Sequence, residues 1–338
     1  MTAVAASETA MAAVVSNATA LNAVVTSQVA LNAVAASETA MAAVIGNATA
    51  LNVVATSQAA MNAVAASETA MTAVIANTAA LNTVVTSHVA MNAVASSYVA
   101  VAAVYESAVA VEAVKANETA WATLTGASSA VMGKAAAKLA GLNPADYADM
   151  NAIAASSTAM AAVASSQTAM AAIFRSSTAL QVVQNNASAW AIFSNASSVV
   201  MGKTVAELAG LNPSSYADMN AIASSSTAMA AMRASTTAMN ALANSTVAYN
   251  ALLSSTLLVR FNPANQNAWR NDTVYAGSGI FVRLVSYNTA SNWYKLDGGS
   301  AITLAAKDSK VVKAFQTSLQ VYWVDYSESA RGVYYIPC

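Results

Sequence analysis

The sequence predicts an α+β chain in which an elongated all-α repeat shaft of short helices, about ten residues per unit, precedes a small C-terminal β-sandwich-like domain. A decapeptide repeat opens the chain and places alanine at every tenth position from Ala10 to Ala130. Serine or asparagine recurs at position seven of these rows. Residues 259–338 instead hold most of the aromatic residues, in β-branched runs separated by turn residues.

The residue spacing of the repeat favours helix over strand. A large apolar residue follows each alanine at position one, as in Met11 and Leu21, and valine stands three places later, as in Val14. We call the residues at position one the anchors. Residues at i, i+3 and i+4 share one face of a helix, and Ala, Met and Leu are good helix formers. We therefore expect the rows to be helical.

A break in each row is needed to keep the anchors together. In one continuous helix, ten residues would rotate the apolar stripe by roughly 80° per repeat. Serine and asparagine are preferred N-caps and compete with the helical backbone when they lie inside it. With Ser7 as N-cap, Glu8 falls in the first turn, where a carboxylate favours the helix dipole. Each helix should run from position eight to position five of the next row.

A thirty-residue period overlies the decapeptide. The segment ASETAMAAV at 6 and 36 returns as ASETAMTAV at 66, and the TSQ or TSH rows recur every third row. A three-sided solenoid would stack like residues every three rows, whereas recent duplication would explain the period without structural meaning. A helix of two turns is unstable alone. The rows must therefore stack on neighbouring rows or on other copies of the chain.

A 69-residue duplication interrupts the repeat, since the segment from Trp121 returns from Trp190. Inside it, Gly141 is placed to end one helix, and Asn143 and Pro144 are placed to begin the next. We expect three parts: a helical decapeptide-repeat shaft (1–130), a repeat shaft with two helical inserts (131–258) and a C-terminal β domain (259–338).

Composition argues against several classes of function. The net charge is -1, only 9% of residues are charged, and no Lys or Arg precedes Lys115. Residues 1–114 therefore offer no basic patch that could bind nucleic acid or an anionic membrane. We expect no signal peptide and no membrane insertion. Cys338 is the only cysteine and His88 the only histidine, and His88 replaces a glutamine of equivalent rows. We expect no enzyme activity, no metal and no cofactor.

The aromatic residues of the β domain are the candidates for binding. They either form a platform for sugar rings or fill the core: Tyr287, Trp293, Tyr294, Tyr322, Trp323, Tyr334 and Tyr335. We select Trp293 and Tyr294, with Asn292 and Asp297, because the turn at 297–299 should expose neighbouring side chains. Arg283 and Lys295 are secondary, since charged residues on strands usually face solvent.

Three phrases carry a family resemblance: SETAMAAV (Ser7 to Val14), SSTAMAAV (Ser156 to Val163) and SQTAMAAI (Ser166 to Ile173). They resemble the low-complexity repeats of tail-fibre and tail-appendage proteins of tailed bacteriophages, over roughly residues 1–258. The resemblance implies a virion protein, extracellular, that forms homotrimers with a repetitive shaft and a β-rich tip at the host surface. The apolar anchors, at fixed spacing, suit an interface between copies.

Three functions remain open. The first is a fibre that displays its β domain for binding a host-surface glycan or protein, with other virion tail proteins as partners. The second is a purely structural filament or collar component, whose β domain serves trimerisation or docking. The third is an ice-binding solenoid, which regular Thr and Ala suggest, although Thr at position nine is replaced in the TSQ and TSH rows.

Overall fold

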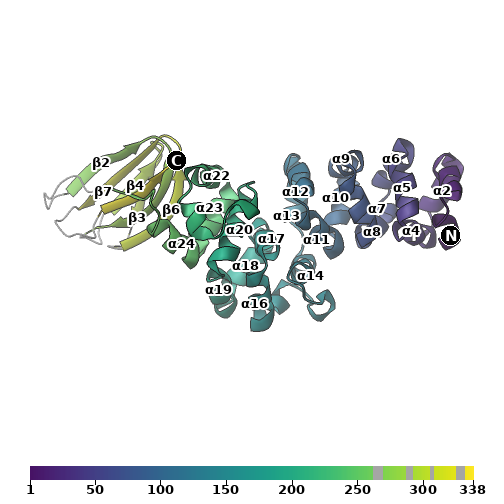
Figure 1. Cartoon of the computed structure of the whole chain (residues 1–338), viewed down its shortest axis with the longest axis horizontal. Coiled ribbons are helices and arrows are strands. Elements are labelled where there is room, and N and C mark those ends of the chain that lie inside the picture. The colour runs from purple at the N-terminus through teal and green to yellow at the C-terminus, as the bar shows by residue number, and fades with distance from the viewer. Residues whose placement is uncertain (262–268, 287–291, 305–307, 325–331) are drawn as a thin grey trace. The chain divides into compact units, whose positions relative to one another are not determined.

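The computed structural model describes residues 1–261, 269–286, 292–304, 308–324 and 332–338. The chain forms two compact units, Met1–Trp190 and Ala191–Cys338. Short helices fill the first unit and begin the second, which ends in two antiparallel sheets (Figure 1). The predicted α+β class is thereby confirmed.

The uninterrupted repeat forms one short helix per row. These helices are α1 (Thr2–Ala5), α2 (Glu8–Val15), α3 (Ala18–Val25), α4 (Gln28–Ala35), α5 (Glu38–Ile45), α6 (Ala48–Thr56), α7 (Gln58–Ala66), α8 (Glu68–Ala76), α9 (Thr78–Thr86), α10 (His88–Ala95), α11 (Tyr98–Glu106), α12 (Ala108–Lys115) and α13 (Glu118–Thr125).

The predicted break at position seven is confirmed by the cap geometry. The side chain of Ser7 accepts a hydrogen bond from the Ala10 N–H at 3.3 Å, and Asn17 accepts one from the Ala20 N–H at 3.0 Å. Both caps have extended backbone, so the chain turns there. Four pairs of consecutive helices have the length and composition of a membrane span, but each pair is bent by 98–104°. No single helix of the described residues is long and apolar enough to cross a membrane.

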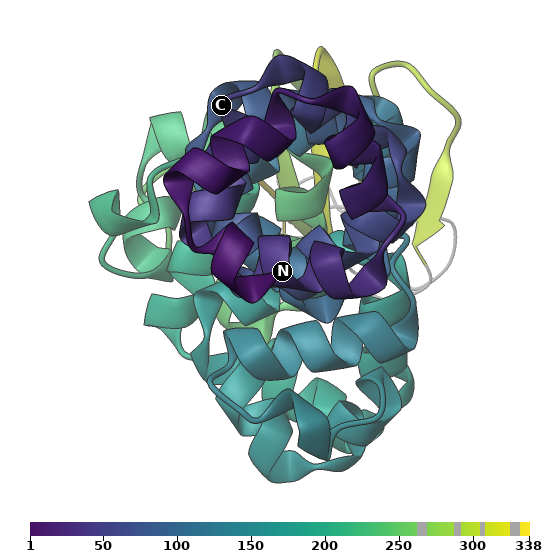
Figure 2. The same cartoon turned by 90° about the vertical axis from the view of Figure 1, so that its right-hand side faces the viewer.

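The bends bring every third helix together. Helix α5 packs on α2, α7 on α4, and α8 on α5. Seen along the repeat, the first helices, in purple, wind round in a ring (Figure 2). One turn thus contains three rows, which favours the solenoid explanation of the thirty-residue period. Serine caps join the turns, since Ser37 Oγ donates to the carbonyl oxygen of Ala5 at 2.6 Å.

The anchors are buried within a single chain. Met41 is 2% exposed, Met61 and Met71 are each 1% exposed, and Leu81 is 3% exposed. The expectation that the anchors form an interface between copies is therefore wrong for these residues. The solenoid buries them because each turn covers the one before it. A homotrimer, if it forms, must use a different surface.

The chain then passes through the two inserts. The first unit continues with α14 (Ser129–Leu139), the 3-10 helix η1 (Pro144–Asp146), α15 (Met150–Ala155), α16 (Ser157–Ser165), α17 (Gln167–Arg175) and α18 (Ser177–Asn185). Helix α19 (Ala187–Ser194) spans the division, and the second unit adds α20 (Ser198–Leu208), η2 (Pro213–Ser215), α21 (Met219–Ala223), α22 (Ser226–Ala234), α23 (Thr236–Asn244) and α24 (Thr246–Leu253).

The predicted signals of the insert are confirmed. Gly141 has φ +73°, and the Leu142 N–H donates to the Ala137 carbonyl at 2.8 Å, which closes α14 in a Schellman motif. Asn143 Oδ1 then accepts from the Ala145 N–H at 3.2 Å. Pro144 is the first residue of the element that follows, which is a three-residue 3-10 helix instead of an α-helix.

Two serine caps, one that also bonds to the preceding turn and one that does not, allow the contribution of the bond between turns to be measured. Ser37→Ala should remove both the N-cap bond and the bond to Ala5, whereas Ser7→Ala removes only an N-cap bond. We expect Ser37→Ala to cost about 0.5–1.5 kcal/mol more, the usual net value of one hydrogen bond. Urea unfolding followed by circular dichroism measures the difference. Equal costs would mean that the cross-turn bond does not stabilise the solenoid.

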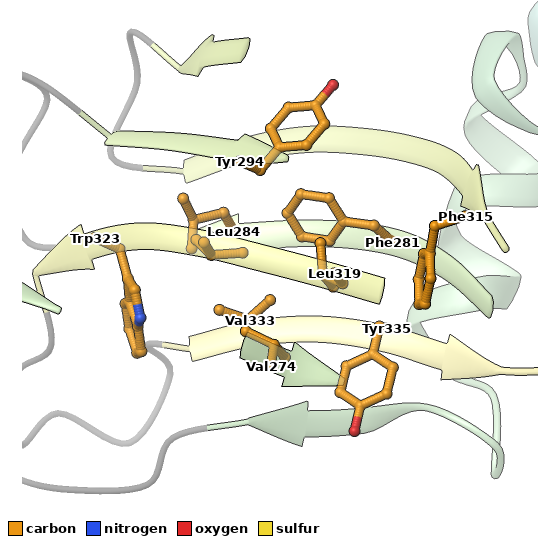
Figure 3. Close-up of a cluster of buried hydrophobic side chains, with 10 residues drawn as sticks. Val274, Phe281, Leu284, Tyr294, Phe315, Leu319, Trp323, Val333 and Tyr335 are labelled. Atoms are coloured by element: carbon orange, nitrogen blue, oxygen red, sulfur yellow. The ribbon is translucent and has the colours of Figure 1, made fainter. Parts of the chain in front are cut away.

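The C-terminal strands form two four-stranded antiparallel sheets, with strand orders β1-β8-β3-β6 and β2-β7-β4-β5. The strands are β1 (Val259–Phe261), β2 (Trp269–Ala276), β3 (Gly279–Val285), β4 (Asn292–Leu296), β5 (Ile302–Leu304), β6 (Asp308–Phe315), β7 (Ser318–Val324) and β8 (Gly332–Pro337). Side chains from both sheets form the core, including Phe281, Phe315 and Trp323 (Figure 3).

The β1-β8-β3-β6 sheet packs on helices of its own unit. Helices α22 and α23 contact β6, and α24 contacts β3. The Nζ of Lys310 lies 4.8 Å from the ring centroid of Tyr249, and Arg233 donates to Gln316. The β1-β8-β3-β6 sheet is therefore covered by helices in part.

Candidate binding site

The outward face of the β2-β7-β4-β5 sheet carries the candidate site. Successive side chains of a strand point to opposite faces, so Trp293 and Tyr294 cannot lie on the same surface. Trp293 is half-buried and Tyr294 is 4% exposed among the core residues. Figure 3 labels Tyr294 within this core. Of the two neighbouring aromatics, only Trp293 is available at the surface.

Two of the predicted binding residues serve the interior. The Tyr294 ring lies edge-on to Phe281, with centroids 5.2 Å apart, and burial raises the pKa of its hydroxyl. Asn292 is 0% exposed, and its Oδ1 accepts from Ser286 Oγ at 3.0 Å. The expectation that the nearby turn exposes Tyr294 and Asn292 is wrong, because both side chains point between the sheets.

Asp297 is exposed, but its carboxylate is used within the fold. Its Oδ1 accepts from the backbone N–H groups of Gln316, Thr317 and Ser318 at 2.8, 2.6 and 3.2 Å, and from Thr317 Oγ1 at 3.1 Å. Desolvation acts to raise the pKa of Asp297, but these hydrogen bonds outweigh it and hold the pKa below the usual range. Asp297 therefore shapes the turn between β6 and β7.

Trp293 is joined at the surface by an aromatic residue from the next strand. Trp293 and Tyr322 are partners in the register of β4 and β7. Their rings are stacked, with centroids 5.4 Å apart and planes 12° apart. The Nζ of Lys295 lies 5.2 Å from the centroid of the Trp293 ring. We call Trp293, Tyr322 and Lys295 the aromatic platform.

Neutral polar groups lie beside the platform. In the register, Thr303 of β5 is opposite Trp293, and Gln320 of β7 is opposite Lys295. Gln320 Nε2 donates to Thr273 Oγ1 of β2 at 3.4 Å. This face thus offers ring surfaces, one ammonium and several hydroxyl or amide groups.

The other aromatic candidates divide between core and surface. Trp323 is 0% exposed, and its Nε1 donates to Asp272 Oδ2 at 3.2 Å; Tyr335 is 6% exposed. Tyr334 lies on the other sheet, where its ring centroid is 5.9 Å from the guanidinium of Arg283. Tyr287 lies outside the described residues. Tyr322 could be assigned to the platform only from the strand register, because no sequence motif indicates that Tyr322 pairs with Trp293.

Within the described residues, no group of three or more His, Cys, Asp or Glu side chains is placed to hold a metal ion. The arrangement can stack on a ligand and donate hydrogen bonds to it.

The comparisons with known proteins give no family. No protein-family model matches the chain, and a search of the curated proteins finds no match. The function must therefore be argued from the chain's own residues.

Proposed function

We propose that this chain is a structural fibre protein of a phage virion, and that its β domain binds the host cell surface. The observation that carries the proposal is the aromatic platform, a stacked Trp293–Tyr322 pair on the outward face of an antiparallel sheet. The decapeptide helices provide a regular scaffold on the same chain.

The chemistry of the platform suits a glycan. The C–H faces of sugar rings stack on aromatic rings, and sugar hydroxyls exchange hydrogen bonds with side chains such as Gln320 and Thr303. Aromatic side chains bring large rigid contact area and are frequent hot spots of binding. Lys295 adds one positive charge beside Trp293. A binding role requires no catalytic group and no cofactor.

The alternative is a structural filament or collar component. It is favoured by the packing of the strands on helices α22, α23 and α24, which ties the β domain to the repeat. In that case the β domain serves trimerisation or docking to other virion tail proteins. Binding of host material to the platform separates the two functions.

Trp293→Ala should reduce binding of the full-length protein to host cells and to a glycan array by at least about tenfold, because a hot-spot aromatic contributes roughly 2 kcal/mol or more. Tyr322→Ala should have a similar effect, since it removes the other half of the stack. Lys313→Ala is the matched control, because Lys313 is exposed on β6 of the other sheet.

Circular dichroism of each variant establishes that the fold is retained. If folded Trp293→Ala and Tyr322→Ala proteins bind as wild type does, the platform is not the site. If the wild-type chain binds no host surface at all, the structural alternative gains support.

A further inference from the structure

The outward face of the β2-β7-β4-β5 sheet carries one positive charge among neutral groups. Cross-strand partners of an antiparallel sheet lie on the same face, as do residues two apart on one strand. The register therefore places these side chains together: Thr273, Trp293, Lys295, Thr303, Gln320 and Tyr322. Lys295 is the only charged residue among them. Asp272 of β2 is opposite the core residue Val321, so it belongs to the inner face.

The ammonium of Lys295 is held beside the platform but is not neutralised there. Lys295 is half-buried, and its Nζ lies 5.2 Å from the centroid of the Trp293 ring. An aromatic ring attracts a cation through its quadrupole but carries no net charge to cancel it. Three other cations, Lys115, Lys138 and Arg283, pair with carboxylates. Within the part of the chain that the structure describes, no carboxylate pairs with Lys295.

The carboxylate that follows Lys295 most closely in the sequence is used elsewhere. Asp297 lies just beyond the end of β4, and its Oδ1 accepts from the backbone N–H groups of residues 316–318. These bonds hold the pKa of Asp297 below its usual range, against the opposing effect of desolvation. The charge of Asp297 therefore serves the turn after β6 and leaves the charge of Lys295 for a ligand.

The charge of the β domain has the same sign as that of Lys295. Residues 259–338 contain eight Lys and Arg and five Asp and Glu, a net charge of +3, so the residues before them carry -4 of the total of -1. This difference favours the approach of an anion to the β domain. Because charges are screened beyond about 8 Å at physiological salt, the group nearest the ligand matters most. At the platform that group is Lys295.

We propose that the glycan bound at the aromatic platform is acidic. A sugar ring stacks on the aromatic residues, and its carboxylate or phosphate group accepts hydrogen bonds from the ammonium of Lys295. A neutral sugar can use the rings and the nearby amide and hydroxyl groups, but only an acidic sugar forms charge-assisted hydrogen bonds with this lysine. The inference rests on the proposed binding of a glycan and adds the charge of the ligand.

The test compares acidic saccharides with neutral forms of the same saccharides. Full-length protein is applied to an array of carboxylated polysaccharides, each beside its carboxyl-reduced counterpart, with phosphorylated and neutral saccharides on the same array. Lys295→Gln removes the charge and keeps a polar side chain, whereas Lys295→Arg keeps the charge. Lys313→Gln is the matched control, because it removes one positive charge from an exposed position on β6 of the other sheet. Circular dichroism checks the fold of each variant.

The wild type should bind an acidic saccharide about three- to tenfold more tightly than its neutral form, and high salt should weaken this preference. Lys295→Gln should abolish the preference without weakening the binding of neutral forms, whereas Lys295→Arg and Lys313→Gln should retain it. A preference for phosphorylated saccharides that is lost in Lys295→Gln supports the proposal with phosphate as the acidic group.

Two results would overturn the acidic ligand and leave glycan binding in place. One is equal binding of acidic and neutral forms by the wild type. The other is an unchanged acidic preference in folded Lys295→Gln. A wild-type protein that binds no saccharide of any kind would overturn both this inference and the proposed binding of a glycan.

Discussion

Replacing Met71 by alanine should lower the free energy of unfolding of the helical repeat by about 2–5 kcal/mol, the range for truncating a large side chain in a core. Met71 is 1% exposed at position one of α8, and α8 packs against both α5 and α11. Its loss leaves a cavity in a stack whose position-ten residues, such as Ala40 and Ala70, are too small to fill it. Urea unfolding followed by far-ultraviolet circular dichroism gives the change.

Thr72→Ala is the control, because Thr72 is the next residue of the same helix and is exposed. Surface substitutions of this kind usually change stability by less than about 0.5 kcal/mol. Hydrogen exchange should show the loss of protection in the turns that contain α5, α8 and α11. Wild-type stability of Met71→Ala would contradict burial of the anchors within one chain.

Gly133→Ala should destabilise the first insert by about 1–3 kcal/mol, as overpacking does in a close-packed core. A Cβ at Gly133 would lie 2.2 Å from the carbonyl carbon of Asp149 and 2.5 Å from the Met150 nitrogen. The backbone at Asp149 begins α15, and its side chain caps that helix through the Ala152 N–H at 2.9 Å. The added methyl group must push this helix start away from α14.

The duplication supplies an internal check of that prediction. Gly202→Ala should have a similar effect, since its Cβ would lie 2.4 Å from the Asp218 carbonyl carbon. Gly46→Ala is the control, because Gly46 has φ -71° and its Cβ would approach no atom closer than 3.2 Å. Thermal unfolding of the three variants tests the ranking. A Gly133→Ala protein as stable as Gly46→Ala would mean that α14 and α15 do not pack this closely.

The helices of the repeat could be predicted because the cause of each break is local. A capping side chain such as Ser7 accepts a hydrogen bond from a backbone N–H only three residues later, so the sequence of one row is enough to predict where its helix begins. The stacking of rows is not local. The thirty-residue period fits both a solenoid and a duplication. The bend of 98–104° within four pairs of consecutive helices favours the solenoid, and residue type alone does not fix the backbone angles that produce it.

At the candidate site, too, local features could be predicted from the sequence and long-range contacts could not. Tryptophan and tyrosine near a turn indicated a surface, and Trp293 does lie at one. Side chains alternate between the two faces of β4, and Tyr294 and Asn292 lie on the buried face. Which face is buried depends on where the second sheet packs, and not on the local sequence. Tyr322 joins Trp293 through pairing across 29 positions of sequence, which is fixed by sheet register. Local composition therefore locates the domain but not its binding face.

The serine bonds between turns restrict how this array can grow or shrink. Five of these bonds share one spacing, in which the acceptor is an alanine at position five, 32 residues earlier: Ala5–Ser37, Ala35–Ser67, Ala55–Ser87, Ala65–Ser97 and Ala223–Ser255. After the inserts the spacing differs, since Ser166 donates to Leu139 and Ser235 to Leu208. Other rows carry valine or isoleucine at position five, followed 32 residues later by asparagine, as in Val15–Asn47 and Ile45–Asn77, or by serine, as in Val25–Ser57 and Ile75–Ser107. Loss or gain of a single row would move serines such as Ser37 away from the alanine carbonyl to which they now donate. Recombination that alters the length of the gene should therefore be tolerated in steps of ninety nucleotides, three rows at a time.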